Sequence, residues 1–169
     1  GADRLSTIVN WEDRKTCVLF GDAAGAMIIS ASDNASQQCL FQKLNSDGGM
    51  GEALYVPRCE QDIPEGGKEG FNGKYDTLQM NGREVYKFAV NALKECVSEA
   101  LEHTGLTHED IKMVVPHQSN IRMLKTAWKK LGFPDDKIYI NIDRFGNTSA
   151  ASIGLCMHEL TDQGKLNEG

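Results

Sequence analysis

Two short segments carry side chains that could stabilise a negatively charged oxygen. They read Val-Pro-His-Gln-Ser-Asn at residues 115–120 and Gly-Asn-Thr-Ser-Ala-Ala-Ser at residues 146–152. Each places a neutral hydrogen-bond donor, His117 or Asn147, after an apolar run and before a helical pattern. Strand-to-helix corners of this kind are where open α/β sheets build their sites. The two donors therefore predict a site that could hold the oxygen of a thioester as it gains negative charge.

Each of these two residues also has a simpler, structural interpretation. A histidine after a buried strand is more often structural than catalytic, and an asparagine before a helix usually serves as an N-cap or turn residue. Together they support each other, because neighbouring parallel strands lie about 4.8 Å apart and side chains at their carboxyl ends can meet. Of the two, His117 is the stronger candidate.

The elements that must position these donors follow from the apolar periodicity. Strands are expected at residues 16–20, 26–30, 39–44, 111–115 and 138–142. Helices are expected between residues 85 and 104, 119 and 131, and 149 and 162, with glycines close to the end of each. Residues 60–74 are rich in glycine and charge and predict an exposed loop. From residue 85 onward, the alternation of helix and strand is typical of a doubly wound α/β layer.

Composition narrows the functional classes. A chain of 169 residues with 40% hydrophobic content can build one core of ordinary size, and a net charge of −6 argues against a general nucleic-acid binder. The sequence contains no run of about 18 apolar residues, the length that a membrane-spanning helix needs. The five cysteines are scattered without CxxC pairs, which favours a reducing, cytoplasmic setting. The histidines lack paired ligand spacing, so no metal site is expected.

With Phe-Gly-Asp-Ala-Ala-Gly-Ala at residues 20–26, the two segments resemble those of the β-ketoacyl-acyl-carrier-protein synthase III enzymes of the thiolase fold. The resemblance covers the chain in order and implies an α/β, thiolase-like layered fold. Residues 1–31 would then end the N-terminal half, and residues 32–169 would form a C-terminal half that lacks its last two strands. The alternation stops on a helix close to Gly169, so we expect a fragment of a longer protein.

The resemblance implies a Cys–His–Asn triad in which His117 and Asn147 match the second and third members. Such enzymes condense a short acyl-CoA with malonyl-acyl-carrier protein at the start of fatty-acid synthesis. They use no cofactor beyond the CoA and phosphopantetheine thioesters that are their substrates, and the full-length protein would be a homodimer. The family's nucleophilic cysteine begins a helix, and none of the five cysteines here has that context. The fragment is therefore expected to be inactive alone.

A basic stripe predicts how partners would be recruited. Its members, Arg122, Lys125 and Lys129, share one side of the expected helix. They either form a solvated face or steer an acidic carrier protein and CoA phosphates. By resemblance, Arg122 docks the carrier and Arg14 lies near the CoA adenine, although Lys15 stands where the family commonly has glycine. The resemblance also assigns a group of residues to the pantetheine tunnel: Ser119, Asn120, Gly82 and Tyr86.

Two other functions remain open. One is a thiolase-fold starter synthase of polyketide or secondary metabolism, and the other is a non-catalytic acyl-carrier binding module that kept the docking helix. A histidine paired with an asparagine, rather than two histidines, disfavours the elongating synthases. A cysteine at a helix start upstream of this chain would favour an enzyme over the binding module.

Overall fold

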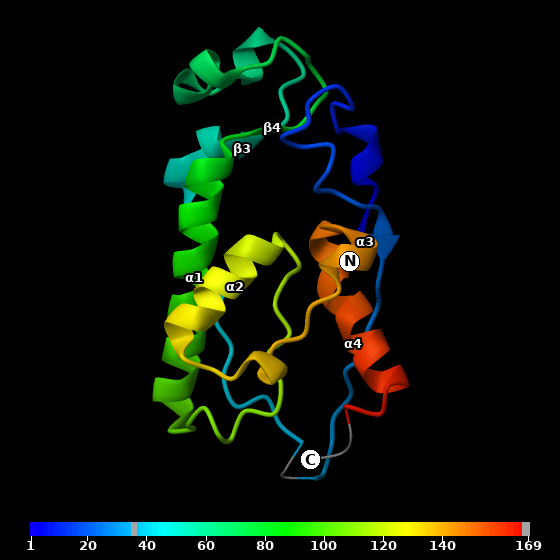
Figure 1. Ribbon diagram of the computed structural model, residues 1–169, viewed down its shortest axis with the longest axis vertical. Coiled ribbons are helices and arrows are strands. Elements are labelled where there is room, and N and C mark those ends of the chain that lie inside the picture. Colours follow the sequence, from blue (N-terminus) through cyan, green and yellow to red (C-terminus); the bar gives the residue numbers. More distant parts are fainter. Residues whose placement is uncertain (35–36, 167–169) are drawn as a thin grey trace.

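The computed structural model describes residues 1–34 and 37–166, and within them the regular structure is mainly helical (Figure 1). The α-helices are α1 (Gly82–Thr104), α2 (Ile121–Leu131), α3 (Ile142–Phe145) and α4 (Ser152–Asp162). The 3₁₀-helices are Leu5–Thr7, Gly48–Ala53, Glu60–Asp62, Glu65–Gly70, Asp135–Lys137 and Ser149–Ala151. The three helices expected from periodicity are confirmed. None of the described helices combines the length and the apolar character that crossing a bilayer requires.

Local capping explains where the two central helices begin and end. The side chain of Asn81 accepts a hydrogen bond from the Glu84 amide at the start of α1, and that of Asn120 accepts one from the Arg122 amide at the start of α2. Both helices end at a glycine in the left-handed conformation, with φ of 69° at Gly105 and 76° at Gly132. These ends were readable from the sequence because each depends on nearby residues alone.

The strands are short and pair in two ways. Two antiparallel pairs join β1 (Ala2–Asp3) to β2 (Ala23–Ala24) and β3 (Leu54–Tyr55) to β4 (Gln79–Met80). Parallel pairing occurs at single bridges, between Val114 and Ile138 and between Phe20 and Asn147. The second bridge places residue 147 beside a segment from the beginning of the chain.

The extended segments around Val114 and Ile138 lie between two helical layers. In Figure 1 they run between the α1–α2 pair and α4. Val114 and Ile138 pack against the cluster of Trp128, Leu131 and Phe133, whereas Met113 and Val115 pack against Tyr139, Cys156 and Leu160. Successive residues thus face opposite layers, as in a strand that is buried on both faces. This arrangement holds the segment that ends at His117.

Several expected strands are wrong. Residues 16–20 form consecutive turns up to the bridge at Phe20, because the Asp13 carbonyl accepts hydrogen bonds from the Thr16 and Cys17 amides. Residues 26–30 and 39–44 join no ladder among the described residues. The expected strand 138–142 pairs only at Ile138, and α3 already begins at Ile142. The expected loop at 60–74 is mostly exposed and contains two 3₁₀-helices.

Candidate active site

The corner that carries His117 is held by a buried glutamine. Gln118 is 0% exposed, and its side-chain amide donates to the carbonyls of Pro116 at 3.0 Å and Tyr139 at 3.2 Å. Its side-chain oxygen accepts from the Asn141 amide at 3.0 Å. The glutamine therefore ties together the ends of the two neighbouring extended segments. This clamp fixes the backbone on which His117 sits.

The surroundings of the His117 ring favour its neutral form. Its Nδ1 lies 2.7 Å from the hydroxyl of Ser152, the first residue of α4. The residue is exposed toward an open cavity, yet the protein around the ring disfavours the charged form. Desolvation therefore lowers the pKa of His117 below its ordinary value, and the Ser149 backbone carbonyl beside the ring, which favours the protonated form, opposes this only in part. A neutral imidazole has one N–H to donate and one nitrogen to accept.

The corner that carries Asn147 depends on two glycines at a close backbone crossing. The Asn147 amide donates to the Leu19 carbonyl at 2.8 Å, and the Gly21 amide donates to the Asn147 carbonyl at 2.9 Å. A Cβ on Gly21 would lie 2.1 Å from the Phe145 carbonyl oxygen. Gly146 has a φ of 70°, where a side chain would be strained. The crossing fixes the position of Asn147 beside the segment 19–21.

The Asn147 side chain is oriented by its own turn. Its oxygen accepts from the Ser149 amide at 3.0 Å, and its nitrogen donates to the Ser119 carbonyl at 3.3 Å. The Ser149 backbone N–H can only donate. Exchanging the oxygen and nitrogen of the Asn147 side chain would therefore remove its hydrogen bond with Ser149. Ser149 has a φ of 49°, an uncommon conformation for a residue with a side chain, and such local strain is often found at functional sites. One N–H of the Asn147 side chain donates to the Ser119 carbonyl, and the second N–H of the same nitrogen takes no part in that hydrogen bond.

Both donors line one largely apolar cavity of about 330 Å³. Ser119 and Asn120 lie beside them in its wall. The apolar part of the wall includes Phe20, Leu54, Met80, Phe88 and Met123. Apolar walls lower the local dielectric constant, so hydrogen bonds to a developing negative charge are stronger there than in water. Two neutral donors in the wall of such a cavity could stabilise an oxyanion.

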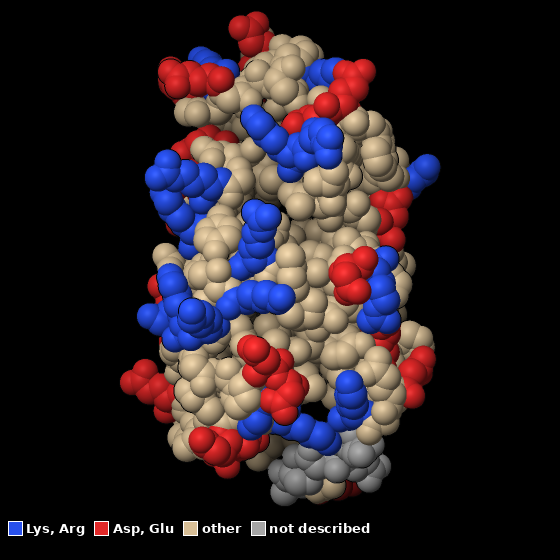
Figure 2. Space-filling model, viewed as in Figure 1, with Lys and Arg blue, Asp and Glu red and all other residues tan. Residues whose placement is uncertain are grey.

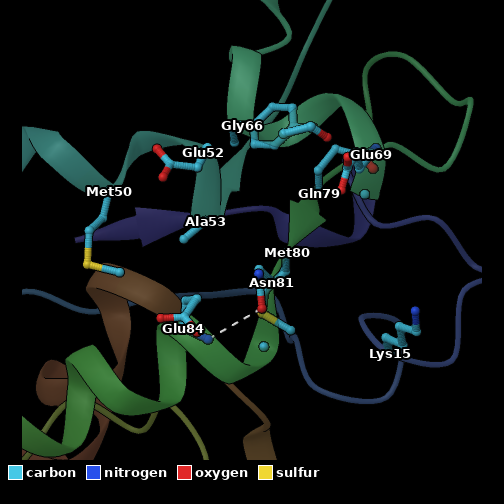
Figure 3. A pocket seen from close by; sticks show the side chains of 14 residues that line it. Lys15, Met50, Glu52, Ala53, Gly66, Glu69, Gln79, Met80, Asn81 and Glu84 are labelled. Atoms are coloured by element: carbon cyan, nitrogen blue, oxygen red, sulfur yellow. Dashed lines mark hydrogen bonds between the residues drawn. The ribbon is translucent and has the colours of Figure 1, made fainter.

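A second cavity, of about 740 Å³, lies at the start of α1 (Figure 3). Gly82 and Lys15 are in its wall, together with the carboxylates of Glu52, Glu69 and Glu84. The two cavities share three wall residues, Met50, Ala53 and Met80, so they are adjacent. The structure therefore places Gly82 next to the His117 cavity but not within it.

The remaining predicted binding residues are spread along the chain. Arg122 is exposed in the first turn of α2, and Arg14 is exposed in the turns that precede Phe20. Tyr86 packs between α1 and α2, where its hydroxyl donates to the Thr126 hydroxyl at 2.6 Å. Figure 2 shows basic side chains gathered on the face where Figure 1 places α2. The structure thus brings together four of the predicted residues, namely His117, Asn147, Ser119 and Asn120.

Sequence reasoning missed two residues that hold the site. Gln118 and Ser152 belong to the two segments that drew attention, yet neither was assigned a role. Both are buried polar residues, at 0% and 1% exposure. A buried polar side chain must find partners, so Ser152, an uncharged polar residue between Ala151 and Ile153, was an available signal, whereas Gln118 lies among other polar residues and gave none.

The cysteines do not supply a nucleophile in the cavity wall, as far as the described residues show. Cys156 is buried in α4 against the Asn141 side chain, and desolvation raises its pKa to about 11. It is therefore a protonated thiol at neutral pH. The other four cysteines are free, and of these Cys17 is partly buried while the rest are exposed.

Two family models match the chain. One, for 3-oxoacyl-[acyl-carrier-protein] synthase III, matches residues 1–48, and one for the C-terminal part of the same family matches residues 101–169. The β-ketoacyl-[acyl-carrier-protein] synthase III of Caldanaerobacter subterraneus subsp. tengcongensis is 43% identical over 169 residues, which are 100% of this chain and 50% of that protein.

Solved structures give the same result. The crystal structure of 3-oxoacyl-[acyl-carrier-protein] synthase III from Aquifex aeolicus VF5 is similar with a TM-score of 0.86 at 37% identity, covering 100% of this chain and 49% of that one. The corresponding synthase from Thermus thermophilus has a TM-score of 0.81 at 37% identity, covering 100% and 51%. The chain therefore spans about half the length of the relatives it matches, and the expected α/β, thiolase-like layered fold is confirmed.

Proposed function

The chain belongs to the 3-oxoacyl-[acyl-carrier-protein] synthase III family, and from this premise we propose that it is part of an enzyme that condenses a short acyl-CoA with malonyl-acyl-carrier protein. The observation that carries the proposal is the convergence of His117 and Asn147 on one apolar cavity. Residues 1–31 would end the N-terminal half of the complete protein, and residues 32–169 would form most of the second half.

In the proposed reaction a cysteine thiolate outside this chain takes the acyl group from acyl-CoA, and CoA leaves as the thiol. The malonyl thioester then loses CO₂: its carbon–carboxylate bond breaks, and the electron pair becomes an enolate. His117 and Asn147 each donate a hydrogen bond to the enolate oxygen, where the negative charge develops. The enolate carbon attacks the carbonyl carbon of the acyl-cysteine and forms the new carbon–carbon bond. The cysteine thiolate leaves.

The binding residues take their roles from their places around the cavity. Ser119 and Asn120 lie in the cavity wall and would contact the pantetheine arm, while Gly82 would flank its entrance from the adjacent cavity. Arg122 would meet the acidic carrier on the exposed side of α2. Arg14 would contact the CoA adenine, and Tyr86 would support the tunnel wall from between the helices. No cofactor other than the two thioester substrates is proposed.

The compartment and the oligomeric state of the complete protein are also part of the proposal. The five free thiols support a reducing compartment such as the cytoplasm. We propose a homodimer for the complete protein, as the resemblance to the family implies.

The test uses the complete protein that contains this chain. His117→Ala and Asn147→Ala should each slow decarboxylation of malonyl-carrier protein by about 10²–10³-fold, the usual cost of losing one oxyanion donor. Acyl transfer to the cysteine, followed by intact mass, should be retained. His158→Ala and Asn91→Ala are matched controls, because both residues are exposed on helices. Parental decarboxylation in either test variant would contradict that residue's role.

A further inference from the structure

The hydroxyl of Ser152 lies directly behind the His117 ring. It is 2.7 Å from Nδ1, and the residue is 1% exposed. The same oxygen is 2.8 Å from the Ser149 carbonyl and 3.4 Å from the Gln118 amide nitrogen. Since a backbone N–H only donates and a carbonyl only accepts, the hydroxyl has two possible acceptors for its single hydrogen: the Ser149 carbonyl and the His117 ring.

The choice between these acceptors decides which ring nitrogen carries the proton. If the Ser152 hydroxyl donates to the Ser149 carbonyl, Nδ1 must hold the proton to bond the hydroxyl oxygen, and Nε2 is left with a lone pair. If the hydroxyl donates to Nδ1, the proton of the neutral ring is on Nε2. Because Nδ1 is held against Ser152, only Nε2 is left to reach the cavity. Only the second arrangement can therefore donate a hydrogen bond to an enolate oxygen.

We propose that Ser152 is a positioning residue that donates to Nδ1 and holds neutral His117 in the tautomer that carries its proton on Nε2. This inference rests on the proposed function, which requires His117 to be a donor toward the cavity. A carbonyl or carboxylate commonly sets the tautomer of a functional histidine by accepting from it. Here a hydroxyl donates to the ring instead, which gives the opposite tautomer.

Removal of the hydroxyl should reverse the tautomer. In Ser152→Ala, Nδ1 loses its donor, and the Ser149 carbonyl, which lies 2.8 Å from the Ser152 hydroxyl oxygen in the parent, is the acceptor that remains beside the ring. That carbonyl can only accept, so it would stabilise a proton on Nδ1 and leave Nε2 without one. The predicted defect is a ring that remains neutral and in place but presents a lone pair to the cavity.

The direct test is ¹⁵N NMR of the imidazole nitrogens in the complete protein, at a pH above the His117 pKa. Labelled histidine would be used, and His117→Gln would assign the signals. The parent should show a protonated Nε2, and Ser152→Ala should show a protonated Nδ1. A protonated Nδ1 in the parent overturns the proposal without reference to any variant, and so does the same tautomer in both proteins.

Kinetics provide the second readout. Ser152→Ala should lower kcat for malonyl decarboxylation by at least about tenfold, toward the 10²–10³ cost of losing a donor, with KM and acyl transfer unchanged. Ser152→Thr keeps the hydroxyl and should restore much of the rate, while Ser98→Ala, exposed on α1, should have no effect. A changed tautomer with an unchanged rate would contradict the role of His117 as a donor and thus the proposed function. An unchanged tautomer in an active enzyme would contradict the role of Ser152 alone.

Discussion

At the scale of single residues, the two candidate donors of the site are neutral side chains, although the cavity wall also includes the carboxylate of Asp47. The cavity wall pairs an imidazole with a carboxamide, and the pKa of His117 is lowered because its ring is desolvated. The enolate exists only briefly during the proposed reaction. Neutral donors can stabilise it without a change in their own charge, and they do not bind the carboxylate of the malonyl substrate too tightly before it leaves as CO₂. Lowering the His117 pKa therefore agrees with the proposed chemistry.

The lowered pKa predicts a pH dependence of stability. The folded-state pKa of His117 lies below the unfolded value of about 6.5, so between these two values the unfolded protein binds more protons. The contribution to stability is therefore fully present above the unfolded pKa and is lost as the pH falls through the folded one. Urea midpoints of the complete protein should fall more on acidification than those of His117→Gln. An equal fall in the two proteins would show that the ring is not desolvated.

The donors, but not their supports, could be predicted from the sequence. His117 and Asn147 are distinctive residue types at strand-to-helix corners. Gln118 and Ser152 act through contacts with Tyr139, Asn141 and the His117 ring, which depend on how distant segments meet. Spacing along the chain does not reveal such contacts.

At the scale of elements, helices were predictable and most strands were not. α1 and α2 have their caps and apolar periodicity within their own residues. A strand exists only where a partner lies beside it, and residues 26–30 have none among the described residues. The run at 16–20 has strand-forming residues, but Asp13 closes turns with it. Local hydrogen bonding of this kind competes successfully with weak strand propensity.

The basic stripe on α2 gives a prediction for this element. In the complete protein, Arg122→Glu should weaken binding of an acidic carrier protein while leaving the turnover of small thioesters nearly unchanged. Arg122, Lys125 and Lys129 are all exposed on a protein of net charge −6, so their attraction for an acidic partner should also fade as salt is added. Carrier affinity measured by titration calorimetry at several salt concentrations tests both points.

Lys94→Glu is the matched control for this charge reversal, because Lys94 is exposed on α1 and the change in net charge is the same. It should affect carrier binding much less than Arg122→Glu does. Equal effects of the two variants, or a carrier affinity that does not respond to salt, would favour the alternative that the stripe is only a solvated face.

At the scale of the whole molecule, the chain leaves large apolar side chains without cover. Ile28 and Ile29 are 98% and 93% exposed, and Leu44 is 99% exposed. Consecutive residues of an extended segment point to opposite sides, so the exposure of both isoleucines means that neither face of this segment is packed. Since the chain spans about half the length of its relatives, we propose that the remainder of the protein covers these side chains.

The isolated chain should therefore self-associate. Exposed apolar surface and unpaired extended backbone both favour association between copies. Sedimentation velocity at tens of micromolar should show oligomers, and their weight-average mass should rise with concentration. Ile28→Thr combined with Ile29→Thr should reduce this association, because threonine keeps the branched shape and removes apolar surface. Thr161→Ser, at an exposed position on α4, is the control. A change at Val90 would not serve, because Val90 is buried.

Addition of the rest of the complete protein in trans tests whether the isolated chain associates because its natural cover is absent or because its surface associates non-specifically. If residues 26–30 associate because their natural cover is absent, the added part should convert the oligomers into a compact species that unfolds cooperatively. The double threonine variant should then bind the added part more weakly than the parent chain does. A stable monomer of the isolated chain would show that the exposed isoleucines are packed in solution, and oligomers that persist in the presence of the added part would place the association elsewhere on the surface.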